Sequence, residues 1–306
     1  MAAVASEIGV EILGDYSLRS IGRLSNELKA DHVVVPDGDA VAFELAKGRR
    51  WPGRGSLTAL VMREKGQPSK IPGGAALKTF AKIALLQLAN LRPEVEIRIL
   101  KSAPWRGFSF LPVSRDPVSL CSTSTKSNRI NCRVLPEGPY WFGVVGSVGH
   151  RKNLPLVAAA LAALDCADVG LAVAGRIEEG VLNRAQPFLD RIQANGGQVK
   201  VIDRLLDDLE MDNFVVELDC VVLAHSNDGP SGILGKAVAA GTSIVAAGAP
   251  TLRADCRQVG SSAEWVRLTE KQLSKAFARA TKKPRPQPDL LSSPAEFAWG
   301  LLGEQP

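Results

Sequence analysis

Several residue types that characterise common protein classes are scarce in this chain of 306 residues. Aromatic residues make up only 5%, which disfavours an RNA-binding protein that stacks bases on aromatic rings. Three histidines and five cysteines, none at C-x-x-C spacing, give a zinc site little to use. An odd cysteine count in a long chain also argues against a disulfide framework. We therefore expect no metal ion and no nucleic-acid partner.

Long hydrophobic segments are missing as well. No apolar run reaches the roughly 18 residues that a membrane-spanning helix needs. Residues 1–13 lack the charged and apolar regions of a signal peptide. These features predict a cytoplasmic protein.

Charge is distributed unevenly along the chain. Residues 1–141 contain 20 basic and 13 acidic side chains, whereas residues 142–306 contain 17 and 19. A basic N-terminal half favours an anionic partner, such as a phosphorylated substrate or peripheral contact with the inner face of a membrane. The same excess is also typical of an ordinary solvated surface, and the composition does not separate these interpretations.

The hydrophobic pattern predicts an α/β fold. Short runs rich in Val and Ile, typical of strands buried on both faces, alternate with helical segments. The expected strands are 32–35, 57–62, 95–100, 142–145, 169–174, 199–202, 220–223 and 243–246. The expected helices are 75–90, 154–164, 178–195, 207–217 and 232–240. This alternation predicts two doubly wound, Rossmann-like domains that face a cleft.

The domain boundaries follow from breaks in this pattern. Residues 104–139 are polar and rich in Ser, Asn and Pro, which indicates a linker. We therefore predict an N-terminal domain over 1–139, including that linker, and a C-terminal domain over 140–285. Residues 286–306 are expected to form a last helix that packs back on the body of the protein through Phe297 and Trp299.

The segment FGVVGSVGHRKN, residues 142–153, is the first candidate binding element. A buried strand runs into a glycine-containing turn, and Arg151 and Lys152 stand where the next helix begins. Cations are disfavoured at the positive end of a helix dipole unless an anion binds there. The pattern is therefore consistent with a phosphate or diphosphate site, and also with an ordinary basic turn.

The segment HSNDGPSGILGKAVAAG, residues 225–241, is the second candidate. A strand ends in a polar turn, and a helix of small residues begins near Ser231 and Gly232. Its free N–H groups are expected at the carboxyl edge of the sheet, where open α/β sheets bind ligands. A structural helix with a good cap has the same pattern.

Together these segments resemble the C-terminal domain of retaining GT-B glycosyltransferases of the family 4-like, group 1 type. Gly146, Ser147, Arg151 and Lys152 match the family's diphosphate-binding turn. Asp228 and Lys236, followed by AVAAGTSIVA, keep the spacing of the family's two glutamates. The resemblance covers roughly residues 140–260 well and the first 100 residues loosely.

The resemblance implies a hexosyltransferase-like enzyme that moves a sugar from a nucleotide-diphosphate sugar with retention, without a metal or a cofactor. The resemblance leaves the acceptor open: a glycan, a lipid-linked molecule and a small molecule are all compatible with it. Arg151 and Lys152 would be catalytic, stabilising the leaving diphosphate. The implied donor-binding residues are Gly146, Ser147, Asp228, Ser231, Gly232, Ile233 and Lys236.

Two departures from the family pattern leave alternatives open. Both glutamates are replaced, by Asp228 and Lys236, and the N-terminal unit is short, as if truncated. A lysine only donates hydrogen bonds, so position 236 is compatible with a phosphate contact, a different donor, or lost turnover. The alternatives are a non-catalytic binding or scaffold protein and a GT-B-shaped nucleotide-sugar epimerase.

Overall fold

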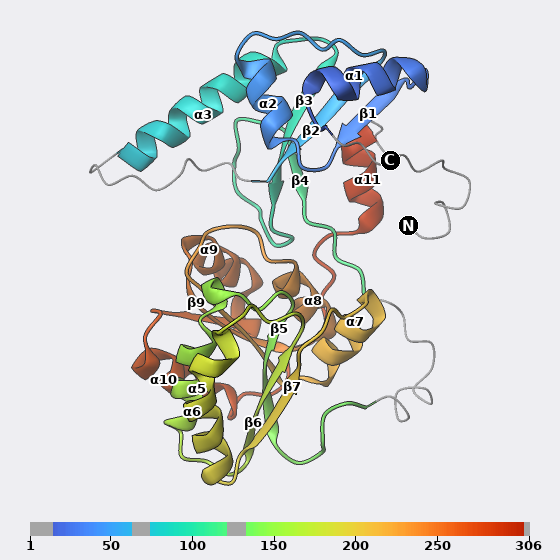
Figure 1. The fold of residues 1–306 in the computed structure, drawn as a ribbon. Coiled ribbons are helices and arrows are strands. Elements are labelled where there is room, and N and C mark those ends of the chain that lie inside the picture. Colours follow the sequence, from blue (N-terminus) through green and yellow to red (C-terminus); the bar gives the residue numbers. More distant parts are fainter. Residues whose placement is uncertain (1–14, 63–73, 121–132, 303–306) are drawn as a thin grey trace. The chain divides into compact units, whose positions relative to one another are not determined.

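A computed structural model describes residues 15–62, 74–120 and 133–302, which form two compact units (Figure 1). The first unit contains the described residues up to Leu100, Phe108–Ser114, and those from Ala298 onward. The second contains Lys101–Gly107 and the described part of Arg115–Phe297. The sequence placed the boundary after residue 139, whereas the units divide at residues 100–115, because the end of the predicted linker packs with the second unit.

The first unit is built on a four-stranded sheet. Its strands, in the spatial order β1-β2-β3-β4, are β1 (His32–Val35), β2 (Ser56–Val61), β3 (Val95–Lys101) and β4 (Val113–Arg115). Strands β1 to β3 are parallel. Helix α1 (Leu18–Glu27) precedes β1, and the parallel strands are connected by α2 (Asp39–Ala46) and α3 (Gly74–Asn90).

Helix α11 (Pro294–Leu302) brings the C-terminal segment to this sheet. His32 on β1 donates from Nε2 to the carbonyl oxygen of Leu301 at 2.9 Å. The Leu301 side chain is buried, whereas Trp299 is 38% exposed. Leu301, which the sequence analysis did not single out, therefore makes the buried contact of this helix end.

The second unit is a six-stranded parallel sheet with helices on both faces. Its strands are β5 (Tyr140–Val145), β6 (Val169–Ala174), β7 (Gln198–Ile202), β8 (Cys220–His225), β9 (Ser243–Gly248) and β10 (Ala263–Val266). The helices are α5 (Leu154–Ala162), α6 (Val181–Ala194), α7 (Asp208–Glu217), α8 (Gly232–Ala240), α9 (Pro250–Val259) and α10 (Glu270–Ala280). The spatial order is β10-β9-β8-β5-β6-β7.

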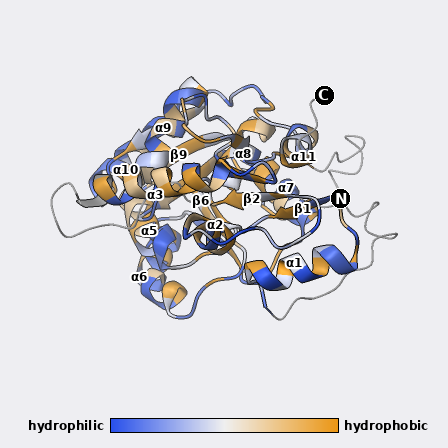
Figure 2. Cartoon of the chain, turned by 90° about the horizontal axis from the view of Figure 1, so that it is seen from above, coloured by the Kyte–Doolittle hydropathy of each residue, from blue (hydrophilic) through white to orange (hydrophobic). Residues whose placement is uncertain are grey.

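Alternation along each strand explains why both sheet faces are buried. On β5, Phe142 and Val144 pack into a cluster with α5, α6 and α10, whereas Trp141 and Val145 pack into a second cluster with α7, α8 and α9. Successive side chains of a strand point to opposite faces, so a continuous apolar run supplies two cores. Figure 2 shows the resulting contrast between largely hydrophobic strands and α1, whose residues alternate in hydropathy.

All eight strands expected from the sequence are present, as are the five expected helices, with ends shifted by a few residues. The sequence analysis missed β4, β10, α1, α2, α9 and α10. Part of the predicted linker, residues 121–132, lies outside the described residues, together with Cys121 and Cys132. Within the described ranges, no helix has the length and apolar character needed to cross a membrane.

Candidate functional site: a cationic pocket at the sheet's switch point

The order of the strands in the second unit marks one place as a binding position. From β5 the chain adds β6 and β7 on one side, and then β8, β9 and β10 on the other. Strands β5 and β8 are neighbours, pairing at Phe142 with Cys220 and at Gly143 with Val221. In open α/β sheets a crevice forms at such a switch point, beyond the carboxyl ends of the strands.

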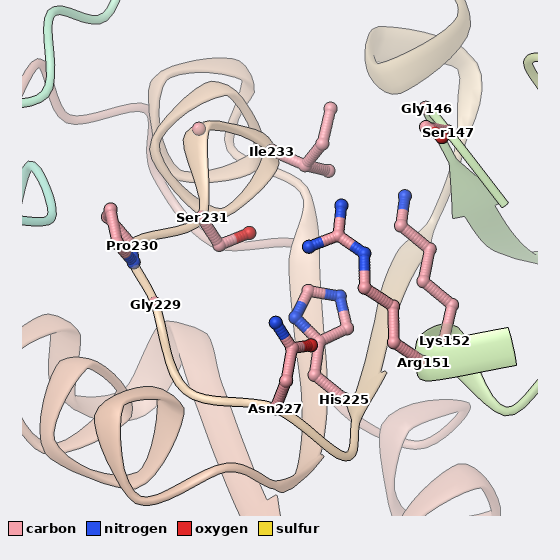
Figure 3. A pocket seen from close by; sticks show the side chains of 11 residues that line it. Gly146, Ser147, Arg151, Lys152, His225, Asn227, Gly229, Pro230, Ser231 and Ile233 are labelled. Carbon is pink, nitrogen blue, oxygen red and sulfur yellow. The ribbon is translucent and has the colours of Figure 1, made fainter. Parts of the chain in front are cut away.

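A pocket of about 200 Å³ lies at this point (Figure 3). This is below the usual range for whole small-molecule sites and is suited to a group such as a diphosphate. It is lined by Gly146, Ser147, Arg151, Lys152, His225, Asn227, Gly229, Pro230, Ser231, Gly232 and Ile233.

The first wall of the pocket follows β5. Gly146 has φ +89°, a conformation that favours glycine. A Cβ added there would lie 3.2 Å from Nζ of Lys152, so glycine also leaves room for the ammonium group. Lys152 is only 7% exposed, and its Nζ donates to the carbonyl oxygen of Val145. The backbone at the end of β5 therefore holds this cation in the pocket.

Hydrogen bonds join this wall to the loop after β8. The carbonyl oxygen of Arg151 accepts from the backbone N–H of Ser226 at 2.9 Å. The side-chain amide of Asn153 donates to Arg151 and to Ala224 at 3.0 and 2.8 Å. Arg151 and Lys152 belong to a short 3₁₀ turn, η2 (His150–Lys152), and no residue of α5 lines the pocket. Both residues come directly before α5, whose N-cap is Asn153, as expected from the sequence, and the 3₁₀ turn is the added detail.

The opposite wall is the N-terminus of α8. Ser231 is the N-cap residue, and its side chain makes no capping hydrogen bond. In Figure 3 its hydroxyl points toward the guanidinium of Arg151. The first N–H groups of a helix and its dipole favour an anion, so Ser231 and Gly232 add a second positive region to the pocket.

Burial and mutual repulsion perturb the ionisable groups in the pocket. Burial, assisted by Arg151, lowers the pKa of Lys152 to about 8. Burial, followed by the charges of Lys152 and Arg151, lowers the pKa of His225 to about 4. Among the described residues, no carboxylate lines the pocket. Uncompensated positive charge in a confined space favours an anionic ligand over a cation.

The structure brings together seven of the nine residues proposed from the sequence as catalytic or donor-binding: Gly146, Ser147, Arg151, Lys152, Ser231, Gly232 and Ile233. Asp228 and Lys236 do not line the pocket. The Oδ1 atom of Asp228 accepts from N and Oγ1 of Thr251 at 3.0 and 2.9 Å, near the start of α9.

Lys236 also has a role different from the one expected. Its ammonium group forms an ion pair with the buried Asp212 of α7 and donates to the carbonyl oxygen of Ser119 at 3.0 Å. These contacts join α8 to its neighbours. The expectation that Lys236 contacts the donor phosphate is therefore not supported by the position of its charged group.

The sequence analysis did not propose four lining residues: His225, Asn227, Gly229 and Pro230. A signal was present, because they follow a buried strand directly and include turn-forming residues. Neither His225 Nε2 nor Asn227 Oδ1 has a hydrogen-bond partner among the described residues, although both are buried. Those ranges also contain no cluster of three or more His, Cys, Asp or Glu side chains suited to a metal ion.

Comparison of the whole chain with known proteins gives structural matches only. No family model matches the sequence, and no curated protein matches it. The crystal structure of Anabaena Alr3699/HepE in complex with UDP has a TM-score of 0.63 at 13% identity, over 92% of this chain and 76% of that one.

Two further structures have other activities in their names. An α,α-trehalose-phosphate synthase (UDP-forming) from Burkholderia xenovorans, in complex with glucose-6-phosphate, has a TM-score of 0.58 at 11% identity, over 94% and 73% of the two chains. A Listeria monocytogenes structure that carries the name UDP-N-acetylglucosamine 2-epimerase has a TM-score of 0.52 at 12% identity, over 93% and 75%. With its two α/β units, the chain has the GT-B fold found in glycosyltransferases.

Proposed function

We propose that this protein is a glycosyltransferase that moves a sugar from a nucleotide-diphosphate sugar to an acceptor with retention and without a metal ion. The observation that supports it is the pocket at the switch point, where two cations and the N-terminus of α8 converge. The relative bound to UDP and the UDP-forming synthase add support for a nucleotide donor.

In the proposed reaction, the pocket stabilises the leaving group. The bond between the anomeric carbon and the β-phosphate oxygen breaks, and the sugar forms a bond to an acceptor oxygen. The proton of that acceptor hydroxyl goes to the leaving diphosphate or, through it, to solvent. Negative charge accumulates on the diphosphate as the bond breaks. Arg151, Lys152 and Gly232 line the pocket proposed to hold that charge, and each donor of this kind contributes about 2.7–4 kcal/mol in known oxyanion sites.

Nucleotide binding tests the proposal directly. In thermal unfolding with UDP, GDP, ADP, CDP or dTDP, we expect one nucleotide at 100 times its Kd to stabilise the protein by about 2.7 kcal/mol. Arg151→Met should abolish that stabilisation, whereas Arg257→Met, at an exposed position on α9, should retain it. No shift with any nucleotide at millimolar concentration would contradict the proposal.

The two alternatives have distinct outcomes. The first alternative, a non-catalytic protein, is favoured by the contacts that Asp228 and Lys236 make outside the pocket. Such a protein would bind the nucleotide but neither hydrolyse nor transfer the sugar. The second alternative, an epimerase, is favoured by the similarity to the Listeria structure. An epimerase would change the sugar's configuration without an acceptor. NMR of the nucleotide-sugar after incubation separates the three.

We also propose that the protein works in the cytoplasm and touches the inner face of the membrane through its basic N-terminal half. Helix α3 contains no acidic residue, and its Lys78 is exposed, whereas its Lys82 is paired with Asp39 of α2. Leu77 and Phe80 on this helix are 70% and 72% exposed. Apolar side chains beside cations are typical of contact with anionic lipid.

Vesicle sedimentation tests this contact. Vesicles containing phosphatidylglycerol should bind the protein at least about tenfold more tightly than vesicles of phosphatidylcholine alone, because the surface charge attracts the cations. Phe80→Glu should reduce the binding, and Leu209→Glu, at an exposed position in the second unit, should not. Equal binding to both vesicle types would contradict the proposed contact.

A further inference from the structure

His225 is the one histidine that lines the pocket, and the proposed mechanism has so far given its imidazole no role. It is the last residue of β8, and its carbonyl oxygen accepts from the backbone N–H of Ala249 at 2.9 Å. The backbone is thus held by the loop after β9. The ring lies below the guanidinium of Arg151 and beside the amide of Asn227 (Figure 3). Its Nε2 is buried and has no partner among the described residues.

The two charged side chains that act on this ring, among the residues that the structure describes, are both positive. Arg151 and Lys152 face it from η2, while Ser231 and Asn227 are uncharged. The nearby carboxylates lie outside the pocket: Asp228 accepts from Thr251, and Asp116 lies beside Gly232, with Oδ2 3.3 Å from the place of a Cβ there. A third positive charge is therefore unfavourable while the pocket is empty, and burial and repulsion lower the pKa of His225 to about 4.

A bound diphosphate reverses this balance. A nucleotide-diphosphate sugar has two negative charges on its esterified phosphates, and these match the charges of Arg151 and Lys152. An opposite charge within about 4–6 Å favours the protonated imidazole. When the sugar leaves, the diphosphate gains a third negative charge, and a third cation in the pocket would balance it.

We propose that the pocket takes up a proton together with its ligand, and that His225 receives this proton and donates it in a hydrogen bond to a phosphate oxygen. This inference rests on the proposed function, and it assigns His225 as a residue that touches the leaving group. Diphosphate affinity then rises as the pH falls. Lys152, whose pKa is about 8, takes up protons only in a higher pH range. The pH at which protons are taken up therefore distinguishes His225 from Lys152.

The experiment measures protons taken up when UDP-glucose binds. Calorimetric titrations at pH 6.0 in two buffers of different ionisation enthalpy give that number directly. UDP-glucose has no group that titrates between about pH 5 and 8, and Lys152 is already charged at pH 6.0. Burial raises the pKa of Asp116 beside Gly232, so only uptake that is lost in His225→Gln is assigned to His225. We expect uptake of roughly half a proton or more, and a Kd that falls at least about fivefold from pH 7.5 to pH 5.5.

Two matched variants complete the test. His225→Gln keeps a polar side chain, so it should still bind UDP-glucose, but with no proton uptake and with a Kd independent of pH between 5.5 and 7. His150→Gln removes an exposed imidazole that contacts Glu178 and does not line the pocket, so it should leave uptake unchanged. Thermal unfolding at each pH checks that the variants are folded.

The outcomes separate this inference from the function on which it rests. If UDP-glucose binds the wild-type protein without proton uptake, or if uptake persists in His225→Gln, the role of His225 is overturned and the nucleotide site stands. If neither UDP-glucose nor any of the nucleoside diphosphates binds, the proposed function fails, and the inference fails with it.

Discussion

Replacing Lys152 by methionine is expected to lower turnover at least about a hundredfold while making the folded protein more stable at neutral pH. The catalytic loss follows from removing one buried donor aimed at the leaving diphosphate, which corresponds to about 2.7–4 kcal/mol. Methionine keeps most of the aliphatic stem, so the packing beside Gly146 and Val145 is largely preserved. Nucleotide affinity should fall as well.

The gain in stability has a defined pH range. Burial lowers the pKa of Lys152 from 10.5 to about 8 in the folded protein, so the charged form is less favourable there than in the unfolded chain. Below pH 8 this costs about 3 kcal/mol. The cost diminishes as the pH rises from 8 to above 10. Lys152→Met should therefore raise the free energy of unfolding at pH 7 by up to about 3 kcal/mol, and by much less at pH 10.5.

Chemical denaturation at the two pH values and a turnover assay at pH 7 check both halves of this prediction. Lys271→Met, at an exposed position on α10, is the control and should change neither quantity. Turnover close to that of the wild type would remove Lys152 from the mechanism. A large loss of stability at pH 7 would instead indicate that its hydrogen bond to Val145 outweighs the cost of burying the charge.

The sequence predicted the second sheet well because its central strands are continuous apolar runs buried on both faces. It missed β10 because three of its four residues are only half-buried, so this edge strand lacks the apolar run that marked the others. Helix α10 was predictable in principle. Thr269 caps it, and Leu273, Ala276, Phe277 and Ala280 are buried at helical spacing.

The part of the pocket that is formed by backbone elements was predictable from the sequence. Strand ends, glycine turns and the start of α8 follow from local sequence, and Gly146, Lys152 and Ser231, which belong to these elements, line one pocket. The direction of a long side chain is decided by tertiary contacts that sequence does not give. Lys236 keeps the family's spacing from Asp228, yet its partner is Asp212, on a different helix and 24 residues away.

Breaking the ion pair between Lys236 and Asp212 is expected to have the second large effect, a loss of folding stability rather than of catalysis. Asp212 is 3% exposed and Lys236 19% exposed at their side chains. Removing Lys236 takes this cation away from the buried carboxylate of Asp212, and breaking a buried ion pair typically costs 3–5 kcal/mol. Lys236→Met should therefore lower the free energy of unfolding by about 3 kcal/mol or more. UDP affinity of the folded protein should stay within about twofold of the wild type.

A double variant keeps this prediction falsifiable if the single variant folds poorly. Replacing a buried ion pair by apolar residues is often nearly neutral, so Lys236→Met with Asp212→Leu should recover much of the lost stability. Equilibrium denaturation of both variants gives the coupling between the two positions, and titration with UDP gives the affinity. A Lys236→Met protein that is fully stable but loses UDP binding would place Lys236 at the nucleotide after all. If the double variant recovers the stability that the single variant loses, Lys236 acts by pairing with Asp212 and so by joining α8 to α7. Removing both charges restores stability only when their role is to compensate one another.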